Sequence, residues 1–203
     1  MTLFDPFRFV PVVVIDDGSS GAELAHALLA GGVGCAEITL RTSEGLAAIA
    51  AASTVPGFVV GAGTVLSTDD LERAVDAGAS FVVSPGWDDD VITRALELGV
   101  AVLPGVATAT DVQRAVRLGL TQLKFFPAES MGGTATLQAF SGPFPGVGFM
   151  PSGGVTAANA AGYLALDNVF AVSGSWVASR QAIADRRWSD IERRARDVTQ
   201  NLS

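Results

Sequence analysis

Short apolar runs rich in Val and Ile alternate with amphipathic stretches rich in Ala and Leu, and this alternation repeats about eight times along the chain. Runs that are apolar throughout are typical of parallel strands in a sheet that is covered by the connecting helices. We therefore expect eight strands, at residues 9–15, 35–40, 58–63, 81–84, 100–104, 122–126, 147–151 and 169–172. The expected helices lie near residues 20–31, 43–52, 68–77, 88–98, 110–118, 134–140, 157–165 and 181–200.

Eight successive strand–helix units predict an α/β fold, a single (β/α)8 TIM barrel that occupies residues 1–203 as one domain. The alternative is an open doubly wound sheet, which typically has about five or six strands, so the number of units favours the barrel. No linker or low-complexity segment suggests a second domain. Helices are expected to begin at Ser20, Ser67, Asp88 and Thr110, whose side chains suit N-caps.

Composition and charge limit the class of protein and its partners. Apolar residues make up 49% and charged residues 17%, as in a compact domain, and no apolar run is long enough to span a membrane. The N-terminus lacks a signal-peptide pattern and Cys35 has no partner for an internal disulfide, so we expect a cytoplasmic protein. The net charge of −8 disfavours nucleic acid and anionic membranes as partners, but a local cluster can still bind an anionic small molecule.

Lys124 is the only lysine in a chain with twelve arginines, and it lies in an apolar run at the end of an expected buried strand. A buried ammonium group is costly unless it is paired or gives up its proton, and a neutral amine can attack carbonyl groups. The structural alternative is a lysine at a strand end whose ammonium group reaches water. The residues that follow the other strands bear on this choice.

The second expected strand ends in polar residues. Side chains alternate along a strand, so Glu37, Thr39 and Arg41 share one face, while Ile38 and Leu40 share the other. The apolar face is expected to pack on helices, which directs Glu37 and Arg41 into the barrel mouth, where this fold places its chemistry. A structural ion pair is one interpretation. The functional one is a carboxylate that transfers protons and a guanidinium group that binds an anion.

Glycine-rich or proline-rich turns follow several other strands. Thr64 follows the glycines of the third strand and offers a hydroxyl group at the same mouth, whereas Pro85, after the fourth strand, is expected to shape the pocket. Turns after the seventh and eighth strands often hold a phosphate in this fold. Most such turns bind nothing, but two at these places indicate an anionic substrate. The residues concerned are Ser152, Gly153 and Gly154, and then Ser173, Gly174 and Ser175.

The remaining reactive residues exclude some chemistries. His26, the only histidine, falls inside an expected helix, and Cys35 falls at the start of a strand, so they do not form a zinc site or a catalytic triad. A buried lysine, a carboxylate and an arginine at one mouth suit Schiff-base chemistry instead. The amine condenses with a ketone, and the protonated imine accepts electrons from a breaking C–C bond. This chemistry needs neither a metal nor a cofactor.

Four segments of the sequence resemble the 2-keto-3-deoxy-6-phosphogluconate (KDPG) and 4-hydroxy-2-oxoglutarate (KHG) aldolase family. The likeness covers about residues 10–180, and the segments are EITLRT at 37–42, GAGTVL at 61–66, LPG at 103–105 and LKFFPAE at 123–129. The resemblance implies a class I aldolase that needs no metal, on a (β/α)8 barrel that assembles as a homotrimer.

The resemblance also implies roles for single residues. Lys124 would be the Schiff-base lysine and Glu37 the general acid and base. Arg41 and Thr64 would hold the carboxylate of the pyruvyl group. The other expected substrate-binding residues are Pro85 and Phe126 in the pocket near the imine, and Ser152, Gly153, Gly154, Gly174 and Ser175 around the phosphate.

The sequence departs from the family pattern at three places. Only about eight residues precede the first strand, where many members have a helix, so we expect the barrel floor to be covered differently. Ser152 stands where Thr is frequent, which keeps the hydroxyl group. Ser173 stands where Gly is common, so the reach of the phosphate loop is expected to differ slightly.

The expected reaction is the reversible cleavage of KDPG to pyruvate and glyceraldehyde 3-phosphate, the aldol step of the Entner–Doudoroff pathway. The alternative is cleavage of KHG to pyruvate and glyoxylate with the same lysine, and both activities can occur together. A relative that acts on the galactonate epimer is disfavoured, because such proteins tend to have Asn where Arg41 stands. A sugar-phosphate binder without catalytic activity is a further alternative, which the Lys124, Glu37 and Arg41 set disfavours.

Overall fold

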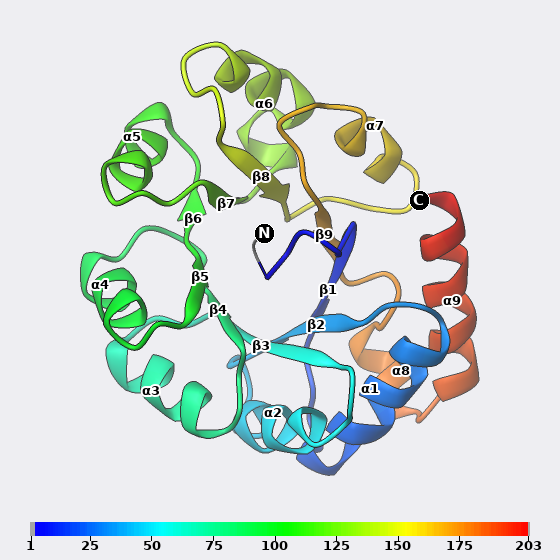
Figure 1. Cartoon of the computed structure of the whole chain (residues 1–203). Helices are drawn as coiled ribbons and strands as arrows, with labels where there is room; N and C mark the ends of the chain where they lie inside the picture. Colours follow the sequence, from blue (N-terminus) through cyan, green and yellow to red (C-terminus); the bar gives the residue numbers. More distant parts are fainter. Residues whose placement is uncertain (1–2, 203) are drawn as a thin grey trace.

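The computed structural model describes residues 3–202, in which helices surround a curled set of parallel strands (Figure 1). Six strands form one parallel sheet in the order β5-β4-β3-β2-β1-β9, and three form a second in the order β6-β7-β8. The strands are β1 Phe9–Val13, β2 Cys35–Thr39, β3 Val59–Gly63, β4 Phe81–Val83, β5 Ala101–Leu103, β6 Gly105–Val106, β7 Gln122–Phe125, β8 Gly148–Pro151 and β9 Val172–Gly174.

The α/β alternation predicted from the sequence is confirmed, and each expected helix region contains a helix. The α-helices are α1 Gly21–Ala30, α2 Gly45–Ser53, α3 Thr68–Asp76, α4 Asp89–Glu97, α5 Ala109–Arg117, α6 Gly133–Ser141, α7 Ala160–Leu164, α8 Arg180–Ala184 and α9 Trp188–Asn201. The expected helix at 181–200 is thus two helices. Arg186, between them, has a left-handed backbone with φ 52°, which a continuous helix does not allow.

The expected helix starts are confirmed at two positions and corrected at one. Ser67 accepts a hydrogen bond from the Asp70 N–H at 3.1 Å, and Asp88 accepts one from the Val91 N–H at 2.9 Å. The prediction of Thr110 is wrong, because Thr108 is the extended residue whose hydroxyl accepts the hydrogen bond of an N-cap. Ser20 precedes α1 but makes no capping bond, since the chain arrives there from a 3-10 turn, Gly18–Ser20.

Two expected strands differ from the observed ones. The fifth is divided at Pro104 into β5 and β6, because proline has no N–H with which to continue the ladder. The last one, expected at 169–172, is observed at Val172–Gly174. Val169 forms only an isolated parallel bridge with Phe149. The regular ladder of β9 begins where Val172 pairs with Phe9 of β1.

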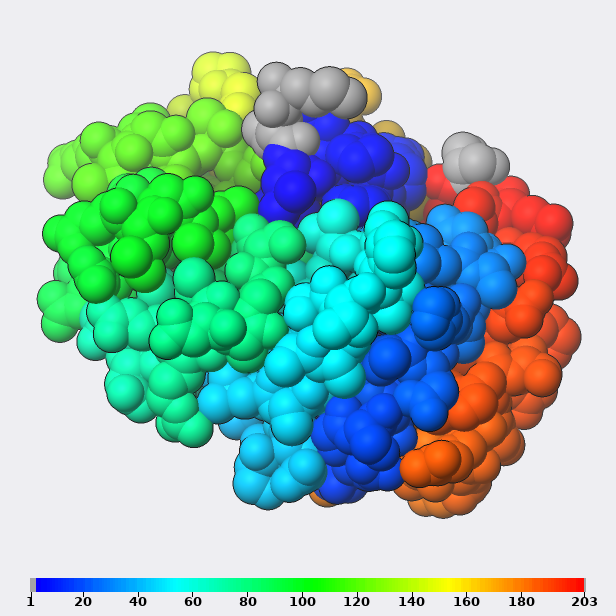
Figure 2. Space-filling view, turned by 60° about the horizontal axis from the view of Figure 1, so that its bottom comes forward, coloured from blue at the N-terminus to red at the C-terminus, as the bar shows by residue number. Residues whose placement is uncertain are grey.

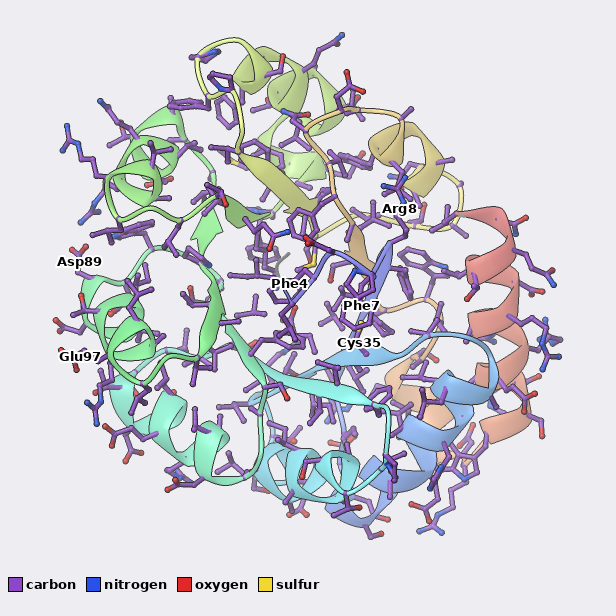
Figure 3. The ribbon with its side chains drawn as sticks, viewed as in Figure 1. Phe4, Phe7, Arg8, Cys35, Asp89 and Glu97 are labelled. Atoms are coloured by element: carbon purple, nitrogen blue, oxygen red, sulfur yellow. The ribbon has the colours of Figure 1, made fainter. Side chains whose placement is uncertain are left out.

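The segment before β1 closes the end of the strand assembly that lies opposite the carboxyl ends of the strands. Phe4 is 3% exposed and belongs to the cluster inside the strands, with its ring centroid 5.0 Å from that of Phe81. Figures 1 and 3 show this segment crossing the centre of the ring. The expectation that the floor is covered differently is therefore met by a phenylalanine in the short N-terminal segment.

The outer core lies between the strands and the helices. Helix α1 packs between α2 and α9, and Figure 2 shows these segments side by side on the surface, in blue, cyan and orange-red. Gly31, at the end of α1, allows this close approach, because a Cβ atom there would overlap Ala195 of α9. Among the described residues, no helix combines the length and apolar character that a membrane span needs.

Candidate active site

Lys124 and Glu37 meet inside the strand assembly, although 87 residues separate them in the sequence. Lys124 lies in β7 and Glu37 in β2, and each points inward. The Nζ atom of Lys124 lies 3.0 Å from Oε1 and 3.3 Å from Oε2 of Glu37. The side chains are 7% and 1% exposed. The prediction of a buried lysine is confirmed, and the alternative in which its ammonium group reaches water is wrong.

The pair has a chemical consequence because it is buried. Two charges removed from water are costly even when they attract each other. A proton that moves from Nζ to the carboxylate during a reaction leaves an amine that can act as a nucleophile. The 3.0 Å separation is within the range for direct proton transfer. The arrangement can therefore supply a nucleophilic amine with a proton acceptor in contact with it.

Two glycines in β3 leave room for side chains of the neighbouring strands. A Cβ atom on Gly63 would overlap the carboxylate of Glu37, and one on Gly61 would overlap the ring of Phe81. Gly61 and Gly63 pair in register with Glu37 and Thr39 of β2. Gly63 thus makes room for the neighbouring carboxylate by allowing its close approach.

Hydrogen bonds to β1 fix the end of β2. Thr39 is buried and donates to the Val13 carbonyl at 2.9 Å, and Thr42 donates to the Ile15 carbonyl at 2.5 Å. Between them, Arg41 is exposed and makes no hydrogen bond or ion pair within residues 3–202. Its guanidinium group is therefore available to a ligand. The predicted shared face is confirmed for Glu37 and Thr39, and Arg41 lies just beyond it.

A cavity of about 380 Å³ opens at the ends of β1, β8 and β9. Phe126 lies in its wall, and the Nζ atom of Lys124 is 5.4 Å from the centre of the Phe126 ring, so this ring connects the buried pair with the cavity. Seven of the expected site residues line this cavity together: Arg41, Phe126, Ser152, Gly153, Gly154, Gly174 and Ser175.

The turn after β8 presents amide groups to this cavity. Gly153 and Gly154 both have left-handed backbones, with φ of 89° and 84°. The carbonyl groups of the turn already accept hydrogen bonds from the segment after β7. The Ser152 carbonyl accepts from the Ala128 N–H at 2.7 Å, and the Gly153 carbonyl accepts from the Glu129 N–H at 3.1 Å. The N–H groups of Gly153 and Gly154 have no partner within residues 3–202. Free amides in such a turn form an anion-binding concavity.

Glu129 supports the same turn with its side chain. A Cβ atom on Gly154 would overlap the Glu129 side chain, so the turn packs directly against it. The hydroxyl of Tyr163 donates to Oε1 of Glu129, and Asn159 donates to the Gly154 carbonyl at 3.1 Å. Burial, followed by this bond to Glu129, raises the pKa of Tyr163. The hydroxyl therefore stays protonated and keeps its role as donor.

Besides the buried Lys124 and Glu37, two expected site residues, Thr64 and Pro85, do not line the cavity. Thr64 follows β3 and has a left-handed backbone with φ 59°, which is uncommon for a β-branched residue and occurs often at functional sites. Pro85 follows β4 and packs so closely on Gly105 that a Cβ atom there would overlap the Pro85 carbonyl. Thr64 thus follows the strand that pairs with β2, Pro85 follows the next strand of the sheet, and both lie outside the cavity that Arg41 and the glycine turns line.

Arg180 and Ser179, which were not predicted as site residues, line the cavity together with Ser175. Ser179 caps α8 by accepting from the Ala182 N–H at 3.2 Å, and Arg180 forms a two-bond ion pair with Asp16. A cation a few residues after the glycine-rich turn of the last strand was the available signal. The position of Asp16 just after β1 was the second part of it.

The remaining reactive side chains lie elsewhere. Cys35 is buried at the start of β2, where burial raises the pKa of its thiol, and His26 is exposed on α1. In the part of the chain that the structure describes, no three His, Cys, Asp or Glu side chains gather as a set of metal ligands.

Known proteins are similar to this chain in sequence and in architecture. The model of the family described as KDPG and KHG aldolase matches residues 3–194. A 2-dehydro-3-deoxy-phosphogluconate aldolase of Pseudomonas aeruginosa is 44% identical over 203 residues, which covers 100% of this chain and 92% of that protein.

Two solved structures extend the comparison. A KDPG aldolase from Legionella pneumophila, with pyruvate captured as a covalent carbinolamine, superposes with a TM-score of 0.92 at 37% identity, covering 96% of this chain and 95% of that one. The aldolase of Zymomonas mobilis, with 3-phosphoglycerate, has a TM-score of 0.87 at 42% identity over 94% of this chain and 90% of that one. The chain therefore belongs to the KDPG and KHG aldolase family.

Proposed function

We propose that this protein is a class I aldolase that reversibly cleaves KDPG to pyruvate and glyceraldehyde 3-phosphate. The observation that carries the proposal is the buried Lys124–Glu37 contact of 3.0 Å next to a cavity lined by arginine and free glycine amides. The Legionella relative, in which pyruvate is held as a covalent carbinolamine, supports the same chemistry here.

The proposed reaction begins when Glu37 takes a proton from Lys124. The neutral amine attacks the ketone carbon of the substrate and forms a carbinolamine, and Glu37 returns a proton as water leaves to give the protonated imine. Glu37 then accepts the proton of the C4 hydroxyl, the C3–C4 bond breaks, and its electrons form an enamine. The aldehyde departs, the enamine carbon is protonated, and water releases pyruvate from Lys124.

The proposed binding roles follow the family resemblance, and the chemistry of each group supports them. Arg41 and Thr64 hold the carboxylate beside the ketone, because a guanidinium group binds a carboxylate with two parallel bonds. Phe126 and Pro85 enclose the imine. The free amides of Gly153 and Gly154 receive the phosphate, together with Ser152, Gly174 and Ser175. The Zymomonas relative with bound 3-phosphoglycerate is consistent with a phosphate site in this fold.

Two other functions can be compared with the cleavage of KDPG. Cleavage of KHG uses the same lysine and carboxylate and does not need the phosphate site, and the family description names both substrates. Rates of cleavage of KDPG and of KHG by the same preparation decide the preference. A binder without catalytic activity has no use for a buried amine in contact with a carboxylate, so the geometry favours the enzyme.

Trapping with borohydride and pyruvate tests the proposed chemistry. Reduction should convert the imine into a stable adduct, with one label per chain on Lys124, the only lysine in the sequence. Mass spectrometry of the intact chain and of its peptides measures the result. The control is borohydride without pyruvate. A chain that stays unlabelled under conditions that label a known class I aldolase would rule out the Schiff-base proposal.

We also propose that the strands close into one (β/α)8 barrel and that residues 1–203 form a single domain. Pro104 alone separates β5 from β6, and the bridge between Phe149 and Val169 joins β8 to the segment before β9. These links support closure on both sides of the second sheet. A crystal structure with an open gap at either place would contradict it.

The proposed assembly is a homotrimer, by analogy with the family resemblance, and the proposed location is the cytoplasm. Light scattering coupled to size exclusion should give about three times the chain mass of 20.8 kDa. A monomer mass at micromolar concentration would refute the trimer. Fractionation of the source cells tests the location.

A further inference from the structure

Arg180 forms part of the cavity wall next to the turns that carry Gly154 and Ser175. Its Nε donates to Oδ2 of Asp16 at 2.6 Å and its Nη2 donates to Oδ1 at 2.5 Å. This two-bond geometry holds the planar guanidinium group in one orientation. The contact joins α8 to the segment directly after β1 and spans 164 residues of sequence.

The ion pair leaves donors of Arg180 unused. A guanidinium group has N–H donors on all three nitrogens. Asp16 takes the one on Nε and one on Nη2, and the donors of Nη1 make no bond within residues 3–202. The side chain is 60% exposed, so a ligand in the cavity can approach it without breaking the contact with Asp16.

The two arginines of the cavity come from separate elements. Arg41 follows β2, the strand that carries Glu37, whereas Arg180 follows β9 and lies beside the glycine-rich turns. The substrate of the proposed reaction also carries two anionic groups, a carboxylate beside the ketone and a phosphate at the far end. One cation at each end would match this separation of charge.

We propose that Arg180 donates to the distal phosphate of the substrate and thereby determines the preference for phosphorylated keto acids, and that Asp16 is the positioning residue that orients its guanidinium group. The inference rests on the proposed function, because it assigns a residue to the far end of the same substrate. A phosphate dianion carries more negative charge than the Asp16 carboxylate, so it attracts Arg180 even though Asp16 neutralises part of the charge.

A neighbouring ion pair provides a matched control. Arg186 donates to Asp17 at 3.2 Å, so it also joins the α8 region to the segment after β1. Its side chain is 58% exposed, close to the 60% of Arg180, but it does not line the cavity. If both pairs serve only to attach these segments, Arg180→Gln and Arg186→Gln should have the same effect.

The experiment compares these two variants on KDPG and on 2-keto-3-deoxygluconate, which lacks the phosphate. We expect Arg180→Gln to raise KM for KDPG about tenfold, with kcat within about twofold, because one charge-assisted contact to the phosphate is lost. The inhibition constant of inorganic phosphate should rise by a similar factor. KM for the unphosphorylated substrate and all constants of Arg186→Gln should stay within about twofold. Equal KM values for KDPG in both variants would overturn the inference.

Asp16→Asn tests the positioning role separately. We expect KM for KDPG to rise about threefold with unchanged kcat, since the guanidinium group loses its fixed orientation, and Asp16→Glu should restore part of the loss. A lower KM in Asp16→Asn would mean that Asp16 only competes with the phosphate, and it would overturn the positioning role. Pyruvate trapping on each variant shows whether the proposed function or only this inference has failed. If the proposed function is wrong, no adduct forms. If only this inference is wrong, the adduct forms and the KM values are unchanged.

Discussion

Lys124→Ala should abolish cleavage and remove the borohydride adduct completely. The sequence has no second lysine that could take over, and no other side chain near Glu37 can form an imine. Without the imine, the electrons of the breaking C–C bond have no acceptor. Because enzymes accelerate reactions by factors of about 10⁶ or more, turnover should fall to the level of the buffer blank. Coupled detection of pyruvate measures it, and mass spectrometry confirms the absence of an adduct.

A second substitution separates loss of the amine from loss of the ion pair. Lys124→Ala leaves the Glu37 carboxylate, which is 1% exposed, without its partner. Removal of one partner of a buried pair typically costs about 3–5 kcal/mol in the free energy of unfolding. Lys124→Arg keeps a positive charge beside Glu37, but a guanidinium group stays protonated and forms no imine. We expect it to be inactive and closer to the parent in thermal unfolding. Turnover by a folded Lys124→Arg protein would place the nucleophile elsewhere.

The contact between Lys124 and Glu37 was predictable from the sequence, because the fold brings the ends of all strands close together. Lys124 and Glu37 both lie on inward faces of parallel strands, whose carboxyl ends lie at one side of the sheet. Side-chain alternation predicted which face of β2 carries Glu37. The glycines after the seventh and eighth strands predicted the turns that could bind an anion. Each of these signals depends on residues close together in the chain.

Features that depend on distant partners were not predictable in this way. The apolar run at 169–172 predicts a strand there. The observed strand is Val172–Gly174, because these are the residues that pair with β1. Arg180 was not assigned, because its place after the last glycine-rich turn is informative only together with Asp16, 164 residues away. The role of Gly63 depends on the carboxylate that β2 places against it. Thr108 replaced Thr110 as the cap because Asp111 completes a reciprocal pair of bonds with it.

Thr64 has an unusual backbone conformation at the end of β3. Its left-handed backbone is a departure from the conformation that a β-branched residue prefers, and strain of this kind is retained where the surroundings enforce it. The residue follows the strand that carries Gly61 and Gly63, so the same chain segment makes room for Glu37 and then turns sharply.

Glu37→Gln should lower kcat by about 10²–10⁴-fold, the range typical of a general acid–base group, while KM changes little. The amide has nearly the same shape and still accepts a hydrogen bond from Nζ, but it cannot carry protons between the amine, the C4 hydroxyl and the enamine carbon. The proposed mechanism uses this one carboxylate at every proton transfer. Steady-state kinetics on KDPG measures the loss, and slow borohydride trapping with pyruvate should show that imine formation is impaired as well. Nearly full activity would require another proton carrier.

Gly63→Ala tests the same role through position instead of chemistry. The added methyl group would overlap the Glu37 carboxylate, so the side chain must move away from Nζ while it keeps its acidic group. Extra methyl groups in packed interiors cost about 1–3 kcal/mol of stability, which a stably folded protein can tolerate. If contact at 3.0 Å is what enables proton transfer, kcat should fall in this variant as in Glu37→Gln, although the carboxylate is retained. Full activity in a folded Gly63→Ala protein would show that the carboxylate acts through its charge, without needing contact with the amine.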